Sequence, residues 1–165
     1  MIFYKGKTRY SSLEDSCVTK LLDYTWLKEH TALYLSDPER AHDWDATPVG
    51  GSGLVPTLLL TTMGRKSGEP RPTPLLYQPT GSGFIVVGSR GGSDRHPAWF
   101  LNLQANPECS VQVGRFAYTA TARILDSTER AAYWEWMVRF WPDYANYQAR
   151  TEREIPIVVL DAEPC

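Results

Sequence analysis

The sequence predicts an α+β domain that is mainly β, with an antiparallel sheet or barrel at its centre. Its 165 residues suffice for one domain with a sizeable core and are few for two. Several short apolar or alternating segments end at clusters of glycine and proline, which is typical of strands linked by hairpins. The few helical segments do not repeat in strand–helix–strand order, which disfavours a parallel sheet.

The N-terminal third is expected to be a helix followed by a loop. Residues 21–35 have the pattern of an amphipathic helix with Leu22, Trp26 and Leu33 on one broad face. We expect this face to pack on the barrel, and contact with a membrane surface is the alternative. Residues 36–53 are polar and rich in proline and glycine, which predicts a flexible linker. The chain is therefore divided into a helix and linker, residues 1–53, and a main body, residues 54–165.

Three strands are predicted in the first half of the main body. Residues 57–62 are apolar and end at a turn over residues 63–69. The second strand, residues 71–78, contains two prolines, so it belongs at an edge or a bulge. Residues 84–89 form the clearest strand, after a turn at residues 79–83.

The second half of the main body mixes helices with strands. Pro97 is expected to open a helix over residues 98–106. Residues 108–113 and 117–125 form a hairpin around residues 114–116. A capped helix then starts at Ser127, with Arg130 in the place of a capping-box glutamate, and runs to about Phe140. Pro142 ends it, a second short helix follows, and residues 155–160 form the last strand.

Charge and cysteine content exclude several classes of protein. The net charge of -2 argues against nucleic acid as the main partner. Cys17, Cys109 and Cys165 have no CxxC or metal-type spacing, so we expect no metal site and a reducing compartment. No stretch approaches the ~20 apolar residues that span a bilayer, and residues 1–7 lack the apolar region of a signal peptide. The expected location is the cytoplasm.

A first cluster with chemical potential is the turn at residues 64–68, which contains Arg65, Lys66 and Ser67, with Arg71 close behind. Two cations and a hydroxyl in a glycine-bounded turn can offer charge and backbone N–H groups to an anion. The alternative is a solvated basic hairpin turn.

A second cluster, residues 89–97, lies between the clearest strand and a helix. Its paired glycines allow a ligand to approach the backbone, and the start of the helix adds a positive dipole end. Its candidate residues are Ser89, Arg90, Gly91, Gly92, His96 and Pro97. The alternative is a crossover loop whose glycines serve only the turn.

A third cluster is aromatic. Trp141, Tyr144 and Tyr147 follow a helix that contains Tyr133, Trp134 and Trp136. Rings at a spacing of three residues on a helix can form the wall of a site for a planar ligand, and core packing is the alternative. A neutral phenol, with a pKa near ~10, can also donate to an oxygen that gains charge. No pairing of a nucleophile with a base is visible, which favours redox chemistry with a bound cofactor.

Taken in order, these clusters resemble the deazaflavin-dependent nitroreductase family of F420-dependent reductases. The resemblance runs from about residue 57 to the C-terminus and is weak before it. The matching stretches are Leu58-Leu59-Leu60-Thr61-Thr62-Met63-Gly64-Arg65-Lys66-Ser67-Gly68, Thr73-Pro74-Leu75, Val87-Gly88-Ser89-Arg90-Gly91-Gly92, His96-Pro97-Ala98-Trp99-Phe100-Leu101-Asn102-Leu103, Ala105-Asn106-Pro107, Trp141-Pro142-Asp143-Tyr144-Ala145-Asn146-Tyr147-Gln148 and Arg153-Glu154-Ile155-Pro156. Trp141 stands where members often have tyrosine, and Arg90 replaces the usual lysine.

The resemblance implies a split β-barrel of the FMN-binding type, with an N-terminal helix and short C-terminal helices, that binds coenzyme F420. By the same resemblance, the phosphate and glutamate tail of the coenzyme is held by Arg65, Lys66, Ser67 and Arg71. Its ring and linker are held by Ser89, Gly91, Gly92, Pro97 and Trp99, and Pro74, Arg90, His96 and Asn102 are further coenzyme-binding residues. Substrate lies against Trp141, Tyr144 and Tyr147, with Ser89, Tyr144 and Tyr147 as candidate catalytic residues.

The activity implied is transfer of a hydride from the reduced deazaflavin to a quinone, a nitroaromatic compound or an activated enone. A deazaflavin carrier without turnover and an FMN- or haem-binding split-barrel protein are the alternatives. The partner is expected to be a small molecule, and the protein a monomer or a homodimer.

Overall fold

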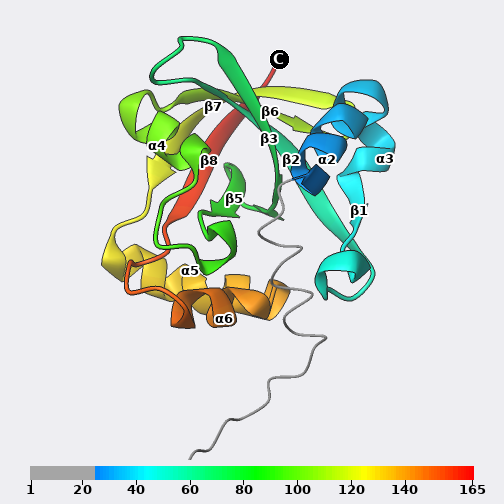
Figure 1. Cartoon of the computed structure of the whole chain (residues 1–165). Coiled ribbons are helices and arrows are strands. Elements are labelled where there is room, and N and C mark those ends of the chain that lie inside the picture. Colours follow the sequence, from blue (N-terminus) through cyan, green and yellow to red (C-terminus); the bar gives the residue numbers. More distant parts are fainter. Residues whose placement is uncertain (1–24) are drawn as a thin grey trace, which may run out of the picture.

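The computed structural model describes residues 25–165, so the expectations for Cys17, Leu22 and residues 1–7 lie outside the described part of the chain. Eight described strands form one antiparallel sheet that curls into a half-barrel (Figure 1). The strand order is β1-β2-β6-β7-β8-β5-β4, and β3 pairs with β2. The strands are β1 Asp43–Asp45, β2 Leu54–Met63, β3 Pro70–Leu76, β4 Gln78–Pro79, β5 Gly83–Val87, β6 Glu108–Val113, β7 Phe116–Ile124 and β8 Ile157–Pro164.

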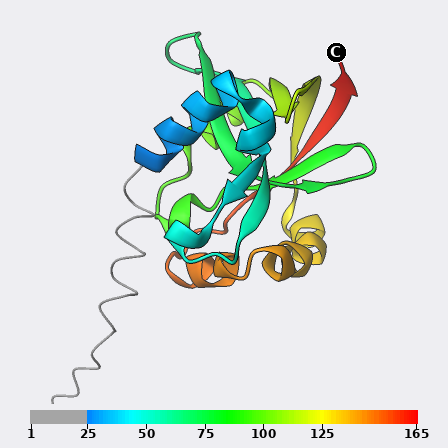
Figure 2. The ribbon, with the colours of Figure 1, turned by 90° about the vertical axis from the view of Figure 1, so that its right-hand side faces the viewer.

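The helices cover two different parts of this sheet. Figures 1 and 2 show α5 and α6 together across one end of it, away from α2 and α3. The helices are α2 Thr25–Ser36, α3 Pro38–His42, α4 Ala98–Ala105, α5 Ser127–Phe140 and α6 Asp143–Ala149, with short 3-10 turns η1 Thr47–Val49 and η2 Arg90–Gly92. None of the helices within residues 25–165 is long and apolar enough to cross a membrane.

Strands β5 and β8 separate two hydrophobic cores. Because neighbouring side chains of a strand point to opposite faces, Ile157 and Val159 pack toward the helices α5 and α6. Val158 and Leu160 pack on the opposite face against α4. Both faces are therefore buried, which explains why β5 and the first half of β8, Ile157 to Leu160, are apolar at every position.

The segment 36–53 is folded, and the prediction of a flexible linker was wrong. The side chain of Asp37 caps α3 by accepting a hydrogen bond from the backbone of Arg40. Strand β1 pairs with the first residues of β2, in a register that places Asp43 opposite Pro56. Ala41, Ala46 and Val49 are buried. The polar residues of this segment make caps and turns, while its small apolar residues anchor it to the sheet.

Most of the predicted elements of the main body are confirmed, with shifted ends. Strand β3 pairs with β2 alone among the described strands, as expected for an edge that contains prolines. The cap of α5 is Asp126, one residue earlier than expected, and its side chain accepts from the backbone of Thr128 and Glu129. Glu129 therefore occupies the capping-box position that had been assigned to Arg130. Strand β8 continues to Pro164 because its polar second half pairs with β7.

Candidate active site

A cavity of about 740 Å³ opens between the N-terminal segment (residues 25–53), strand β3, the β5–α4 connection (residues 88–97) and α6. Its size suits a small organic ligand or cofactor. Residues from all three predicted clusters line it. They are Arg65, Ser89, Arg90, Gly91, His96, Pro97, Trp141, Tyr144 and Tyr147, and Pro74 and Trp99, which the resemblance pointed to, also line the cavity.

The β5–α4 connection forms one wall with an unusual backbone. Three successive residues have positive φ: Arg90 at 46°, Gly91 at 61° and Gly92 at 81°. Glycine adopts this conformation without a steric penalty, whereas Arg90 does so at a cost of about 1–2 kcal/mol. The turn exposes Ser89 and Gly91 to the cavity. Gly92 is buried behind them and does not line it.

The basic turn between β2 and β3 contributes a cation to the rim of the cavity. The Oδ1 atom of Asn102 accepts from the backbone N–H of Arg65 at 3.2 Å and from its Nη1 at 3.0 Å. The Nδ2 atom of Asn102 donates to Thr62 Oγ1 at 3.0 Å. Asn102 is buried and does not line the cavity, so it holds Arg65 from behind.

Lys66, Ser67 and Arg71 lie on the exposed part of this turn, outside the cavity wall. Arg71 Nη2 donates to Ser67 Oγ at 3.1 Å and also pairs with Glu69 at 3.4 Å. The turn therefore presents Lys66 and the Arg71–Glu69 pair to solvent, beside Arg65 in the chain.

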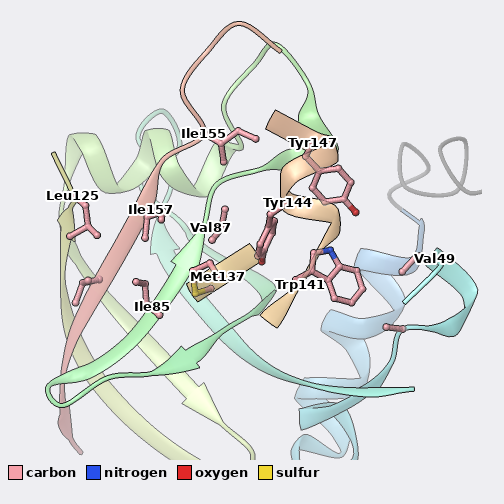
Figure 3. Close-up of a cluster of buried hydrophobic side chains, with 12 residues drawn as sticks. Val49, Ile85, Val87, Leu125, Met137, Trp141, Tyr144, Tyr147, Ile155 and Ile157 are labelled. Carbon is pink, nitrogen blue, oxygen red and sulfur yellow. The ribbon is translucent and has the colours of Figure 1, made fainter. Parts of the chain in front are cut away.

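The aromatic wall comes from α6 and from Trp141, which caps the C-terminal end of α5. Figure 3 shows Trp141, Tyr144 and Tyr147 grouped together beside the segment of Val49. The two tyrosine rings lie 6.2 Å apart in an edge-on contact. Burial raises the pKa of the Tyr144 hydroxyl well above its ordinary value, so this phenol stays protonated and can donate a hydrogen bond. The expectation that Tyr133, Trp134 and Trp136 share this wall is not met, because none of them lines the cavity.

The N-terminal segment supplies a further wall that sequence reasoning missed. Trp26 and Leu27 of α2 and Trp44 of β1 line the cavity, and the two tryptophan rings stack with centroids 5.1 Å apart. Trp26 had been placed on the apolar face of the predicted helix, and the available signal for Trp44 was a large aromatic residue in the polar stretch assigned to a linker. A linker has no structural need for such side chains.

A second missed residue is Arg153, which precedes β8. Its guanidinium donates to the carbonyl oxygens of Gly88, Ser89 and Ser93, so it supports the cavity wall from behind. Its sequence neighbourhood gives no local sign of this role, because the acceptors are more than 50 residues away along the chain.

Together, the curled sheet and its helices define a protein of split-barrel fold, with a cavity lined by aromatic side chains and by Arg65. A family model described as F420H(2)-dependent quinone reductase matches residues 39–162. The F420H(2)-dependent quinone reductase Rv1261c of Mycobacterium tuberculosis is 38% identical over 144 residues, which cover 82% of this chain and 95% of that protein.

Two solved structures agree with this match. A structure described as an F420-H2 dependent reductase, FDR-A, is 40% identical with a TM-score of 0.58, over 63% of this chain and 92% of that one. Another, described as a domain-swapped dimer, is 36% identical with a TM-score of 0.60, over 82% of this chain and 96% of that one. This chain belongs to the F420H(2)-dependent quinone reductase family. It is an F420-dependent oxidoreductase, and the resemblance to F420-dependent reductases is confirmed.

Proposed function

We propose that this protein reduces a quinone, with F420H2 held in the cavity as the hydride donor. The observation that carries the proposal is a cavity with aromatic walls and a cationic rim. Trp26 and Trp44 lie in its wall with Tyr144 and Tyr147, while Arg65 marks the rim. A flat ring system with a polyanionic tail needs both kinds of surface.

The tail of the coenzyme is proposed to run from Arg65 along the exposed turn toward Lys66 and Arg71. Arg65 is suited to this task because Asn102 fixes both its backbone and its guanidinium. A preorganised cation loses less conformational entropy when it pairs with a phosphate or a carboxylate. The exposed cations beyond Arg65 then extend the contact in solvent, where salt screens it.

The ring of the coenzyme is proposed to lie against the β5–α4 connection. Ser89, Gly91 and Pro97 line the cavity there, and Gly91 has no side chain to keep a ring away from the backbone. When bound, reduced F420 supplies the hydride. The protein positions the two reactants and excludes water from between them.

The acceptor is proposed to lie beside the tyrosines of α6. A quinone oxygen gains negative charge when its ring accepts a hydride, and a fixed hydroxyl donor stabilises that charge. Tyr144 remains protonated because of its burial, and Tyr147 and Ser89 also line the cavity. Nitroaromatic compounds and activated enones develop charge on oxygen in the same way and are the other candidate acceptors.

The test is steady-state oxidation of F420H2 against a panel of quinones, nitroaromatics and enones. We expect the highest kcat/KM with a quinone. Tight binding of F420 without turnover of any acceptor would instead support a carrier. FMN that copurifies with the protein, or binds as tightly as F420, would overturn the choice of coenzyme.

The remaining proposals concern compartment and assembly. Cys109 and Cys165 are free thiols, which suits a reducing compartment, and we propose the cytoplasm. We propose a monomer or a homodimer that acts on a small molecule. Light scattering on the purified protein distinguishes the two assemblies.

A further inference from the structure

We propose that Arg153 is a positioning residue: it fixes the backbone of the β5–α4 connection and directs the ring N–H of His96 into the cavity. The inference rests on the proposed function for its effect on coenzyme binding. Its structural part stands on contacts within residues 88–153.

Arg153 uses all of its N–H donors on this connection. Nε donates to Ser93 O at 2.7 Å, and Nη2 donates to Ser89 O at 2.8 Å. Both Nη atoms also reach Gly88 O at 3.2 Å. Nη1 contacts Nδ1 of the His96 ring, again at 3.2 Å. These contacts match the five donor hydrogens of a guanidinium.

The contact with His96 determines where the ring carries its proton. An arginine N–H can only donate, so Nδ1 of His96 must accept. The proton of the neutral ring therefore sits on Nε2, which has no hydrogen-bond partner among the described residues. The ring lies in the cavity wall and packs on Phe100 of α4, with centroids 4.7 Å apart. Nε2–H is thus a donor available to a ligand.

Burial and a neighbouring cation favour the neutral form of the His96 ring. Burial, followed by repulsion from Arg153, lowers the pKa of His96. Arg90 lies on the same side, since its Nη1 donates to the carbonyl of His96 at 3.4 Å, and Arg95 precedes His96 in the chain. The nearest acidic group of the connection is Asp94, which accepts from Thr151 Oγ1 at 2.8 Å. Burial and the charge of Arg153 both disfavour a positive charge on the ring.

The connection needs such support because its backbone is strained. Arg90 is the one described non-glycine residue with positive φ. A conformation of this kind persists only when its surroundings hold it in place. Arg153 binds the carbonyls on both sides of Arg90, those of Ser89 and Ser93, and so closes the turn from behind.

The test is NMR titration of the histidine rings in the coenzyme-free protein, which has only three histidines. In wild type, His96 should show the Nε2–H tautomer and a protonation midpoint below the ordinary value. Arg153→Met should raise that midpoint by about one pH unit, since it removes a like charge. Arg153→Lys, which keeps the charge, should leave the midpoint near that of wild type.

Arg130→Gln is the matched control. Arg130 also donates to backbone and side-chain oxygens, at Ile155 O and Gln148 Oε1, but does not touch His96. It should lower the melting temperature while the His96 midpoint stays as in wild type. An unchanged midpoint in Arg153→Met, or an equal shift in Arg130→Gln, would overturn the role of Arg153.

Coenzyme affinity gives the functional readout. Arg153→Met should weaken F420 binding about tenfold, because the connection must be ordered again on binding, and Arg130→Gln should bind as wild type does. Wild-type affinity in Arg153→Met would contradict the positioning of the coenzyme site. If the wild-type protein itself failed to bind F420, the proposed function would fail, and the His96 titration would still decide the structural role.

Discussion

Gly92 lies so close to Tyr147 that a Cβ atom at residue 92 would sit 2.6 Å from the Tyr147 carbonyl oxygen. This contact joins the β5–α4 connection to α6. The wall proposed for the coenzyme ring and the wall proposed for the acceptor therefore meet at this backbone contact. Gly91, by contrast, has open space where a Cβ atom would lie, so alanine substitutions at Gly91 and Gly92 should differ in their effect on stability.

Gly92→Ala should destabilise the protein more than Gly91→Ala. Both residues have positive φ, which costs alanine about 1–2 kcal/mol. A Cβ at Gly91 meets nothing within 4 Å, so strain is its whole cost. A Cβ at Gly92 also collides with the Tyr147 backbone, which adds ~1–3 kcal/mol. Urea unfolding of both variants checks this order, and equal losses would contradict it.

Replacement of Arg65 or Lys66 by alanine should weaken F420 binding and reduce its dependence on salt. A charge-assisted hydrogen bond is worth roughly 1.5–3 kcal/mol, so each variant should lose about tenfold or more in affinity. Fluorescence titration at two salt concentrations measures both effects. Arg139→Ala, an exposed cation on α5, is the control and should bind as wild type. If both Arg65→Ala and Lys66→Ala kept wild-type affinity, the tail would have to lie elsewhere.

Tyr144→Phe and Tyr147→Phe should slow hydride transfer and leave coenzyme affinity nearly unchanged. A donor to a developing oxyanion is worth on the order of 10²–10³ in rate when it acts alone, and less where Ser89 or water substitutes. Single-turnover rates of the two variants and of the double variant measure the effect, with melting temperatures alongside. Wild-type rates combined with lower melting temperatures would assign the hydroxyls a structural role only.

Acid should destabilise the fold through His30, which packs α2 against the sheet. His30 Nε2 donates to Ala41 O at 2.8 Å, and burial lowers the pKa of the ring below its ordinary 6.5. The unfolded chain therefore binds a proton more readily than the folded one. Stability should be constant above about pH 6.5 and decline as the pH falls toward the lower pKa of the folded state.

His30→Gln provides the comparison for this effect, because a glutamine cannot gain the charge. The loss of unfolding free energy between pH 7.5 and pH 5 should be smaller in His30→Gln than in wild type. Equal losses would show that His30 does not carry the acid sensitivity. Since α2 also supplies Trp26 and Leu27 to the cavity, we expect coenzyme affinity to fall over the same pH range.

The predictable parts of this molecule are those whose pattern is local. The hairpin of β6 and β7 closes at Gly114 as expected, and Pro97 stands at the start of α4. Alternation of apolar and polar residues, with glycine or proline at the ends of a segment, is enough to predict such elements. The clusters around Arg65, Ser89 and Tyr144 line one cavity. The family resemblance, which rests on the order of these motifs, had predicted that they form one site.

The parts that could not be predicted depend on contacts between distant residues. Strand β1 has three residues and exists because β2 pairs with it, so Trp44 was assigned to a linker. Asn102 was expected to touch the coenzyme, but its hydrogen bonds go to Arg65 and Thr62 across the fold. Arg153 acts on carbonyls and one ring nitrogen that no sequence pattern connects to it.

The most direct test of the central claim is a single-turnover experiment with the wild-type protein. The protein is loaded with one equivalent of F420H2 and mixed with a quinone in a stopped-flow instrument. We predict that the bound F420H2 is oxidised in one phase, far faster than free F420H2 mixed with the same quinone, and that one quinone is reduced per coenzyme. Oxidation no faster than that of free F420H2, with the coenzyme bound, would contradict the account.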